Sequence, residues 1–256
     1  MQRLRRLSGR RSARLDEGAF VIDGPILLRE ALRAGVRIDE VFATTSADST
    51  AVSAATAAGA RLHEVTPEVL AQAVDTVTPH GVAAIAGRVE VGLEVAMQAA
   101  ARGPLALVLV DVADPGNAGT LLRVAEAAGA AAVVFCGSSV DPSNAKCVRA
   151  SAGALFHVPV ASGGEVVAVL EELGRRGVRR AATVVAGGVP YDEVDLRGPV
   201  ALMLGSEAHG LPDVVMAAVD DRLSIPMAGR SESLNVAMAG AVLCFESLRQ
   251  RRAAPR

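Results

Sequence analysis

The chain has 256 residues, of which 51% are hydrophobic and 2% aromatic, and its formal net charge is −2. This length allows one large domain or two smaller ones. No uninterrupted apolar run approaches the roughly 20 residues that a membrane-spanning helix needs, so the composition indicates a soluble protein without a membrane partner. The scarcity of aromatic residues argues against an RNA-binding surface that stacks bases on rings.

The first fifteen residues contain six arginines and no acidic residue. Such a stretch is compatible with a transit peptide, a disordered tail or an arm that binds phosphates, but it lacks the apolar core of a secretory signal. The three cysteines, Cys136, Cys147 and Cys244, fit neither a zinc-ligand pattern nor a disulfide framework. We therefore expect no metal site, buried cysteine side chains and a reduced, cytoplasmic setting.

The N-terminal part alternates strands and helices. Residues 20–22 predict a strand, Gly24 and Pro25 a turn, and residues 26–32 a helix with one apolar face. Further along, Thr66 is suited to an N-cap and Pro67 to the first helical position, and residues 81–87 predict another strand. We expect a small α/β domain over residues 1–95, connected by residues 96–104 to the remainder.

From residue 105 onward, short and nearly continuous apolar runs alternate with helical patterns. Runs of this kind are typical of strands covered on both faces, so the region 105–256 is expected to form a parallel α/β sheet. The predicted strands are residues 105–111, 131–137, 156–160, 181–187, 200–205 and 222–227.

The loop after the first of these strands reads DVADPGNAGTLLR. Asn117 is suited to cap a helix that starts at Ala118. Gly119 lies four residues before Arg123, which leaves space above the arginine on one helical face. A purely structural interpretation stays open, in which Asn117 only caps the helix and Arg123 only pairs with Glu126.

A second polar loop follows the strand at residues 200–205. In it Glu207 lies between two glycines, where a carboxylate can accept hydrogen bonds. His209 is a weaker candidate for a general base, because a lone loop histidine is more often a surface residue.

A third loop precedes a helix that is apolar on every side except at Asn235. We expect Ser233 to cap this helix, near Leu234, and the helix to be buried in a core or against a second subunit. A buried Asn235 would need a partner, since an unsatisfied buried amide costs roughly 1–3 kcal/mol.

Taken together, three motifs in this order resemble those of the SpoU (TrmH-like) family of RNA ribose 2′-O-methyltransferases, which belong to the SPOUT class. The motifs are N-x-G-x-x-x-R, L-G-x-E-x-x-G-L and I-P-M-x-G-x-x-x-S-L-N. Here they consist of Asn117, Gly119 and Arg123; Leu204, Gly205, Glu207, Gly210 and Leu211; and Ile225, Pro226, Met227, Gly229, Ser233, Leu234 and Asn235.

The resemblance implies an α/β fold whose C-terminal parallel-sheet domain contains a deep trefoil knot, and a homodimer whose active site draws on both subunits. It implies S-adenosyl-L-methionine as cofactor, bound at Leu204, Gly205, Ile225, Met227 and Leu234. It assigns the catalytic set to Arg123, the presumed activating residue, with Asn117, Glu207, Ser233 and Asn235 orienting it and the ribose.

The N-terminal region resembles the small L30e-like substrate-binding domain of this family through FVIDG and VTPHGVAAIAG, although Asp23 stands where glutamate is usual. The implied substrate is a ribose in RNA, with 23S ribosomal RNA favoured over tRNA. Predicted RNA contacts are Arg5, Arg6, Arg10, Arg11 and Arg149, the last in an R-x-S-x-G-A segment seen in large-subunit RNA modifiers.

Two alternatives stay open, and a third is disfavoured. The segment Ser151-Ala152-Gly153 is equally compatible with a close-packed helix end. The protein as a whole is also compatible with a non-catalytic RNA-binding factor that keeps the fold. A dehydrogenase-like nucleotide site is disfavoured, because the first loop lacks the third glycine of the dinucleotide fingerprint.

Overall fold

The computed structural model describes residues 1–74 and 80–253, and their contacts divide the chain into two units. The first comprises residues 1–89 and 143–157, and the second comprises residues 90–142 and 158–256. The segment 143–157 therefore packs with the N-terminal part although it interrupts the sequence of the second unit. The part of the chain that the structure describes contains no helix long and apolar enough to cross a membrane.

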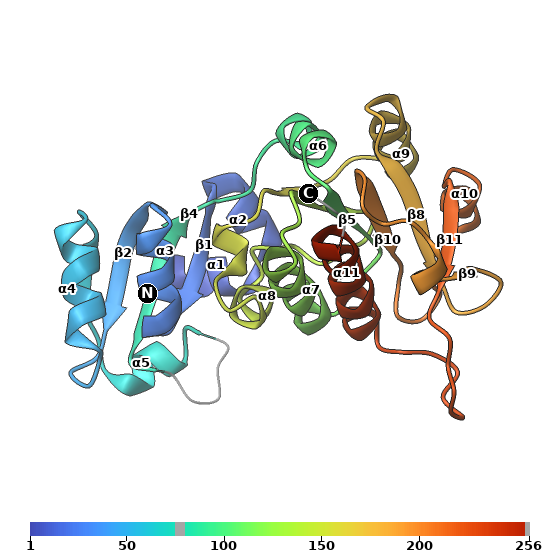
Figure 1. Ribbon diagram of the computed structural model, residues 1–256. Helices are drawn as coiled ribbons and strands as arrows, with labels where there is room; N and C mark the ends of the chain where they lie inside the picture. The colour runs from blue at the N-terminus through green and yellow to red at the C-terminus, as the bar shows by residue number, and fades with distance from the viewer. Residues whose placement is uncertain (75–79, 254–256) are drawn as a thin grey trace. The chain divides into compact units, whose positions relative to one another are not determined.

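The first unit is built on a mixed four-stranded sheet of order β1-β4-β2-β3 (Figure 1). Its strands are β1 (Ala19–Asp23), β2 (Ile38–Ala43), β3 (Arg61–Glu64) and β4 (Val82–Gly87). Strands β2 and β3 pair in parallel, whereas β4 runs antiparallel to both β1 and β2. Its α-helices are α1 (Gln2–Gly9), α2 (Arg11–Glu17), α3 (Pro25–Arg33), α4 (Ser49–Ala57), α5 (Pro67–Ala71) and α8 (Ala145–Ala150).

The arginine-rich start forms helices α1 and α2, so it is a folded part of this unit and not a disordered tail. Leu4 and Leu7 are fully buried and join a core cluster with residues of β1, β2 and β4. Arg14, which is also buried, donates to the backbone oxygen of Leu7 at 2.9 Å and so joins the two helices. The i, i+3 spacing of the two leucines was the sequence signal for this amphipathic helix.

Segment 143–157 packs on the first unit through α8 and the short 3-10 helix η1 (Ala154–Phe156). The Phe156 ring lies 6.4 Å from that of Phe20, and the Arg149 guanidinium lies 3.5 Å from the Asp23 carboxylate. Ser151 is fully buried and its hydroxyl donates to a backbone oxygen of the preceding turn at 2.7 Å. These contacts favour the close-packed interpretation of the segment.

The second unit contains a seven-stranded parallel sheet of order β7-β6-β5-β10-β8-β11-β9. Its strands are β5 (Leu105–Val110), β6 (Ala132–Cys136), β7 (Val160–Ser162), β8 (Arg179–Val184), β9 (Val189–Pro190), β10 (Val200–Leu204) and β11 (Asp221–Ser224). The α-helices are α6 (Leu93–Arg102), α7 (Pro115–Ala127), α9 (Val166–Arg175), α10 (Asp213–Met216) and α11 (Val236–Ala253), and η2 (Tyr191–Glu193) is a 3-10 turn.

Both faces of this sheet are covered, as the continuous apolar runs predict. Helices α7 and α11 lie side by side on one face, and α6 and α9 lie on the other (Figure 1). Gly240 of α11 allows a close approach, since a Cβ there would lie 2.3 Å from the Leu121 side chain of α7. All three cysteines are buried, and burial raises the pKa of the Cys136 and Cys244 thiols to about 12.

Some boundaries differ from the sequence-based expectations. Most of the connection expected at residues 96–104 is helix α6, because Ala96, Met97 and Ala100 pack into the core of the second unit. The strand expected at residues 156–160 begins only at Val160, because η1 occupies Ala154–Phe156.

Candidate functional site

The three motif loops lie at one edge of the second sheet. They follow β5, β10 and β11, and the strand order places β10 next to β5 with only β8 between β10 and β11. Because all these strands are parallel, their carboxyl ends share one edge, where ligands bind in open α/β sheets. The fold therefore brings together residues more than 100 positions apart in the sequence.

A continuous set of hydrogen bonds joins the three loops. The side-chain amide of Asn235 donates to the side-chain oxygen of Asn117 at 3.0 Å. The amide of Asn117 in turn donates to the carboxylate of Glu207 at 2.8 Å. Each motif thus contributes one member to an Asn235–Asn117–Glu207 network. We expected a buried Asn235 that needs a hydrogen-bond partner. Asn117 is that partner, but Asn235 is exposed and not buried.

Both helix caps differ from the prediction. Helix α7 begins at Pro115, and Asp114 is its N-cap, accepting the backbone N–H of Asn117 at 2.8 Å. The Asn117 side chain is consequently inside the first turn and free to bond across to other loops. Proline prefers the first helical position, so the Asp-Pro pair was the signal for this start.

Helix α11 begins at Val236 and is capped by Asn235, not by Ser233. The side-chain oxygen of Asn235 accepts the backbone N–H of Ala237 at 2.9 Å and of Met238 at 3.3 Å. Ser233 lies in the preceding loop, and its hydroxyl makes no hydrogen bond to any residue that the structure describes.

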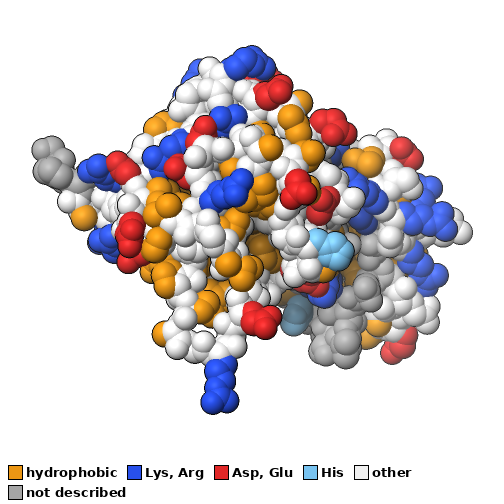
Figure 2. Space-filling view, turned by 90° about the vertical axis from the view of Figure 1, so that its right-hand side faces the viewer, with side chains coloured by type: hydrophobic (Ala, Val, Ile, Leu, Met, Phe, Trp, Pro, Cys, Tyr) orange, Lys and Arg blue, Asp and Glu red, His pale blue; other side chains and the backbone are white. Residues whose placement is uncertain are grey.

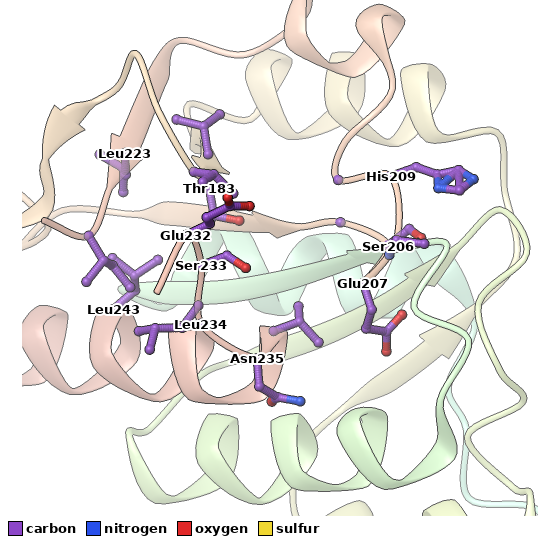
Figure 3. Close-up of a pocket in the computed structure, with 18 of the residues that line it drawn as sticks. Thr183, Ser206, Glu207, His209, Leu223, Glu232, Ser233, Leu234, Asn235 and Leu243 are labelled. Atoms are coloured by element: carbon purple, nitrogen blue, oxygen red, sulfur yellow. Dashed lines mark hydrogen bonds between the residues drawn. The ribbon is translucent and has the colours of Figure 1, made fainter. Parts of the chain in front are cut away.

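A cavity of about 560 Å³ opens beside this network, within the usual range for small-molecule sites. Its lining comes from the loops after β8, β10 and β11 and from the start of α11 (Figure 3). Lining residues include the predicted cofactor contacts Gly205, Ile225, Met227 and Leu234 and the predicted catalytic residues Glu207, Ser233 and Asn235.

Three predicted residues lie outside this lining, and one of them, Asn117, is joined to it through its hydrogen bonds to Glu207 and Asn235. Leu204 is fully buried, and its side chain lies beside Gly240 in the core. Arg123 is exposed on α7 and pairs with no carboxylate in residues 1–74 or 80–253, so the predicted alternative of a pair with Glu126 does not form. Figure 3 shows the His209 ring pointing away from the other labelled side chains of the pocket.

The pocket wall is shaped by a close approach of two backbone segments. A Cβ at Gly205 would lie 2.4 Å from the backbone carbon of Gly210, a distance that no side chain can occupy. Ser206 and Gly210 exchange two backbone hydrogen bonds, of 3.0 and 2.9 Å, which hold the turn closed. Glycine is therefore required at 205, and both Gly205 and Gly210 line the pocket.

Two residues missed at the sequence level shape the first loop. Asp111 adopts a left-handed backbone conformation with φ 56°, and its carboxylate accepts the backbone N–H of Ser138 at 2.6 Å. Together with the Asp114 cap, this bond fixes both ends of the turn that carries Asn117. Aspartate tolerates the left-handed region better than most residues, but the sequence alone does not reveal which aspartate occupies it.

The predicted RNA-contacting arginines lie in the first unit: Arg5 and Arg6 are on α1, Arg11 opens α2, and Arg10 lies between the two helices. Arg5, Arg6, Arg10 and Arg11 are exposed. Arg5 donates to Gln72 and Arg6 pairs with Glu17, whereas Arg10 and Arg11 make no side-chain bond to any residue in the described ranges. Arg149 is only half-buried but faces Asp23.

Known proteins resemble this chain over nearly its whole length. A 23S rRNA (guanosine(2553)-2′-O)-methyltransferase, RlmP, from Bacillus subtilis is 31% identical over 233 residues, covering 91% of this chain and 89% of that protein. A 23S rRNA (guanosine-2′-O-)-methyltransferase, RlmB, from Ralstonia nicotianae is 36% identical over 206 residues, covering 80% of this chain and 83% of its own.

Solved structures agree in fold. An AdoMet-bound rRNA methyltransferase from Sinorhizobium meliloti superposes with a TM-score of 0.85 at 30% identity, covering 97% of this chain and 93% of that one. The SpoU methyltransferase AviRb from Streptomyces viridochromogenes, in complex with AdoMet, gives 0.86 at 25% identity, with 99% and 98% covered.

Residues 1–84 match the MRM3-like substrate binding domain, which agrees with the resemblance noted for the N-terminal region. Residues 104–245, more than half of the chain, match the SpoU rRNA Methylase family. With the three motifs joined around one pocket, this chain belongs to the SpoU family of RNA ribose 2′-O-methyltransferases.

Proposed function

We propose that this protein transfers the methyl group of S-adenosyl-L-methionine to a ribose 2′-hydroxyl of 23S ribosomal RNA. The observation that carries the proposal is the Asn235–Asn117–Glu207 network at the rim of the cavity. The names of RlmP and RlmB support a guanosine as the target. A ribosomal substrate is consistent with the cytoplasmic setting expected from the sequence.

The cavity fits the proposed cofactor. Apolar side chains such as Leu223, Ile225 and Leu243 line it, which suits an adenine ring. The glycine turn at 205 offers backbone groups, and Glu232 and Ser233 offer polar side chains. The bound cofactor would supply an electrophilic methyl group on a sulfonium.

Arg123 is the proposed residue that steers the attacking hydroxyl. A guanidinium has a pKa above about 12 and is a poor proton acceptor, so a role as general base conflicts with its chemistry. Its charge and its donors suit a phosphate neighbouring the reacting ribose and the negative charge that develops on the attacking oxygen. The proton would then pass to a phosphate oxygen or to water.

The other predicted catalytic residues position neighbouring groups by hydrogen bonds and do not take part in the bond changes. Asn117 is fixed by bonds at both ends of its side-chain amide, and Glu207 terminates the network as an acceptor. The Ser233 hydroxyl has no partner in the described residues and lines the pocket, so it is available to a ribose hydroxyl.

We further propose a homodimer in which Arg123 of one copy serves the pocket of the other. Two observations support it: Arg123 does not line the pocket of its own chain, and α11 exposes Met238 and Phe245 at 55% and 48%. Figure 2 shows hydrophobic side chains, in orange, grouped on the face of the molecule that it displays. A second copy would cover that apolar surface, as is common for symmetric oligomers. A trefoil knot in the second unit stays a prediction from the family resemblance.

RNA binding is assigned to the exposed arginines of α1, α2 and the position between them, especially Arg10 and Arg11. Phosphate contacts of this kind make binding depend on salt. Truncating residues 1–14 is unsuitable as a test, because it would remove the buried Leu4 and Leu7. The double variant Arg10→Gln, Arg11→Gln removes charge alone and should weaken RNA binding without lowering the melting temperature.

The test of the proposed function separates cofactor binding from transfer. Calorimetry measures S-adenosylmethionine binding, and radiolabelled methyl incorporation into 23S rRNA measures the reaction. Arg123→Ala should keep the cofactor affinity and lose methyl transfer, whereas Arg123→Lys should keep a small part of the transfer activity. If the wild-type protein binds the cofactor but methylates neither rRNA nor tRNA, the non-catalytic alternative is correct.

Mapping ribose methylation in cells with and without the protein identifies the nucleotide. Loss of a single 2′-O-methyl group in 23S rRNA is the expected result. Loss in tRNA instead, with rRNA unchanged, would contradict the ribosomal assignment while leaving the chemistry intact.

A further inference from the structure

The cavity is lined by acidic side chains without basic ones. Glu207 and Glu232 both line it, and no lysine or arginine among the described residues does so. The remaining titratable residue of the lining, His209, has its ring turned away from the other labelled side chains in Figure 3. The wall of this pocket therefore carries negative charge that it does not itself neutralise.

Neither carboxylate is neutralised by an ion pair. Glu207 accepts a hydrogen bond from the amide of Asn117, which is uncharged. Glu232 is exposed in the loop after β11 and forms neither an ion pair nor a hydrogen bond with any residue the structure describes. Figure 3 draws the two carboxylates on opposite sides of the pocket, with Glu232 beside Thr183 and Ser233.

The proposed reaction changes the charge of the ligand in this pocket. In S-adenosylmethionine the ammonium and carboxylate cancel at neutral pH, and the sulfonium leaves one positive charge. After transfer the sulfur is a neutral thioether, and S-adenosylhomocysteine has no net charge. A negative environment consequently attracts the substrate form more strongly than the product form.

We propose that Glu232 is a specificity-determining residue that favours the sulfonium cofactor over its thioether product and so limits product inhibition. This inference rests on the proposed function, since it assumes that the cavity holds the cofactor. Glu232 is a better test position than Glu207, because Glu207 also holds Asn117. Glu232→Gln keeps the size and polarity of the side chain and removes only its charge.

The experiment compares three ligands by calorimetry with the full chain. They are S-adenosylmethionine, S-adenosylhomocysteine and sinefungin, in which a protonated amine replaces the sulfonium. Because Glu232 is exposed and partly screened by solvent, Glu232→Gln should weaken the two cationic ligands by about two- to fivefold and leave the thioether unchanged. Raising the salt concentration should likewise reduce the preference of the wild-type protein for the two cationic ligands over the thioether.

Glu171→Gln is the matched control. Glu171 is exposed on α9, on the other face of the sheet, and makes no side-chain contact with a described residue, so its loss should change no affinity. If Glu232→Gln weakened the binding of all three ligands equally, the inference would be overturned, because Glu232 would then contact a part that all three ligands share. No change in any affinity would overturn it as well. Failure of the wild-type chain to bind S-adenosylmethionine would instead overturn the proposed function.

Discussion

The two roles of Asn235 can be separated by substitution. Its side-chain oxygen caps α11 by accepting two backbone N–H groups, and its amide group donates to Asn117. Asn235→Asp retains an acceptor at the helix N-terminus and adds a negative charge that the helix dipole favours. The same change removes the donor. With aspartate at position 235, the side-chain amide of Asn117 has a carboxylate on each side, the new one and that of Glu207. Whichever way this amide is turned, its oxygen then faces a carboxylate.

The energies follow from these contacts. Loss of the cap in Asn235→Ala costs about 0.5–2 kcal/mol, and loss of the bond to Asn117 costs about 0.5–1.5 kcal/mol, at the lower end because the pair is exposed. Asn235→Asp loses only the second contribution. We expect the melting temperature of Asn235→Ala to lie about 2–4 °C below that of Asn235→Asp, for a difference of roughly 1 kcal/mol.

The assay combines thermal unfolding, followed by circular dichroism, with single-turnover methyl transfer at saturating cofactor and RNA. Both variants should lose about tenfold or more in transfer rate, because a small displacement of an orienting group is costly in rate. A fully active Asn235→Asp would refute the role of the network in positioning. Equal melting temperatures for the two variants would refute the assignment of Asn235 as the cap.

Three further outcomes are expected. Leu7→Ala should destabilise the first unit by about 2–5 kcal/mol in urea unfolding, because the side chain is fully buried; a smaller change would mean that α1 contributes little to the core. Gly205→Ala should abolish cofactor binding in calorimetry, whereas Gly229→Ala, with nothing within 4 Å of the added carbon, should retain it; equal affinities would contradict the close approach at 205. The Cys136 and Cys244 thiols should resist alkylation in the folded protein at pH 8, since burial raises their pKa to about 12. Because their folded pKa exceeds the unfolded value of 9.0, the stability they contribute is present below pH 9 and is lost as pH rises towards 12, which alkaline unfolding curves would detect.

Periodicity and start signals predicted much of the fold. Thr66 caps α5 and Pro67 opens it, as expected, and the apolar runs of the C-terminal region form a parallel sheet. The alternation of apolar runs with helical patterns and the length of each run suffice to predict such elements, because each strand is marked by its own apolar run. The two-residue strand β9 and the docking of residues 143–157 on the first unit were not predicted, because both depend on tertiary contacts.

The roles assigned to the site residues stay predictions, but the structure shows which of these residues lie together and how the helices beside them begin. The network joins Asn117, Glu207 and Asn235, which the family resemblance had grouped. Both predicted caps were wrong, since Asp114 and Asn235 cap the helices that were assigned to Asn117 and Ser233. Several residues near each helix start can serve as a cap, and backbone geometry decides among them.

These caps explain why the network needs amides at two of its three positions. Asn235 must accept from the first turn of α11 and donate to Asn117, and Asn117 must accept from Asn235 and donate to Glu207. Positions 117 and 235 therefore both require an uncharged side chain that donates one hydrogen bond and accepts another. Neither aspartate nor alanine can do both. Glu207 only accepts, so all donors point towards it and the charge of the network lies at one end, inside the pocket wall. The cap of α11 thus sets the direction of the network, which ends at the Glu207 carboxylate.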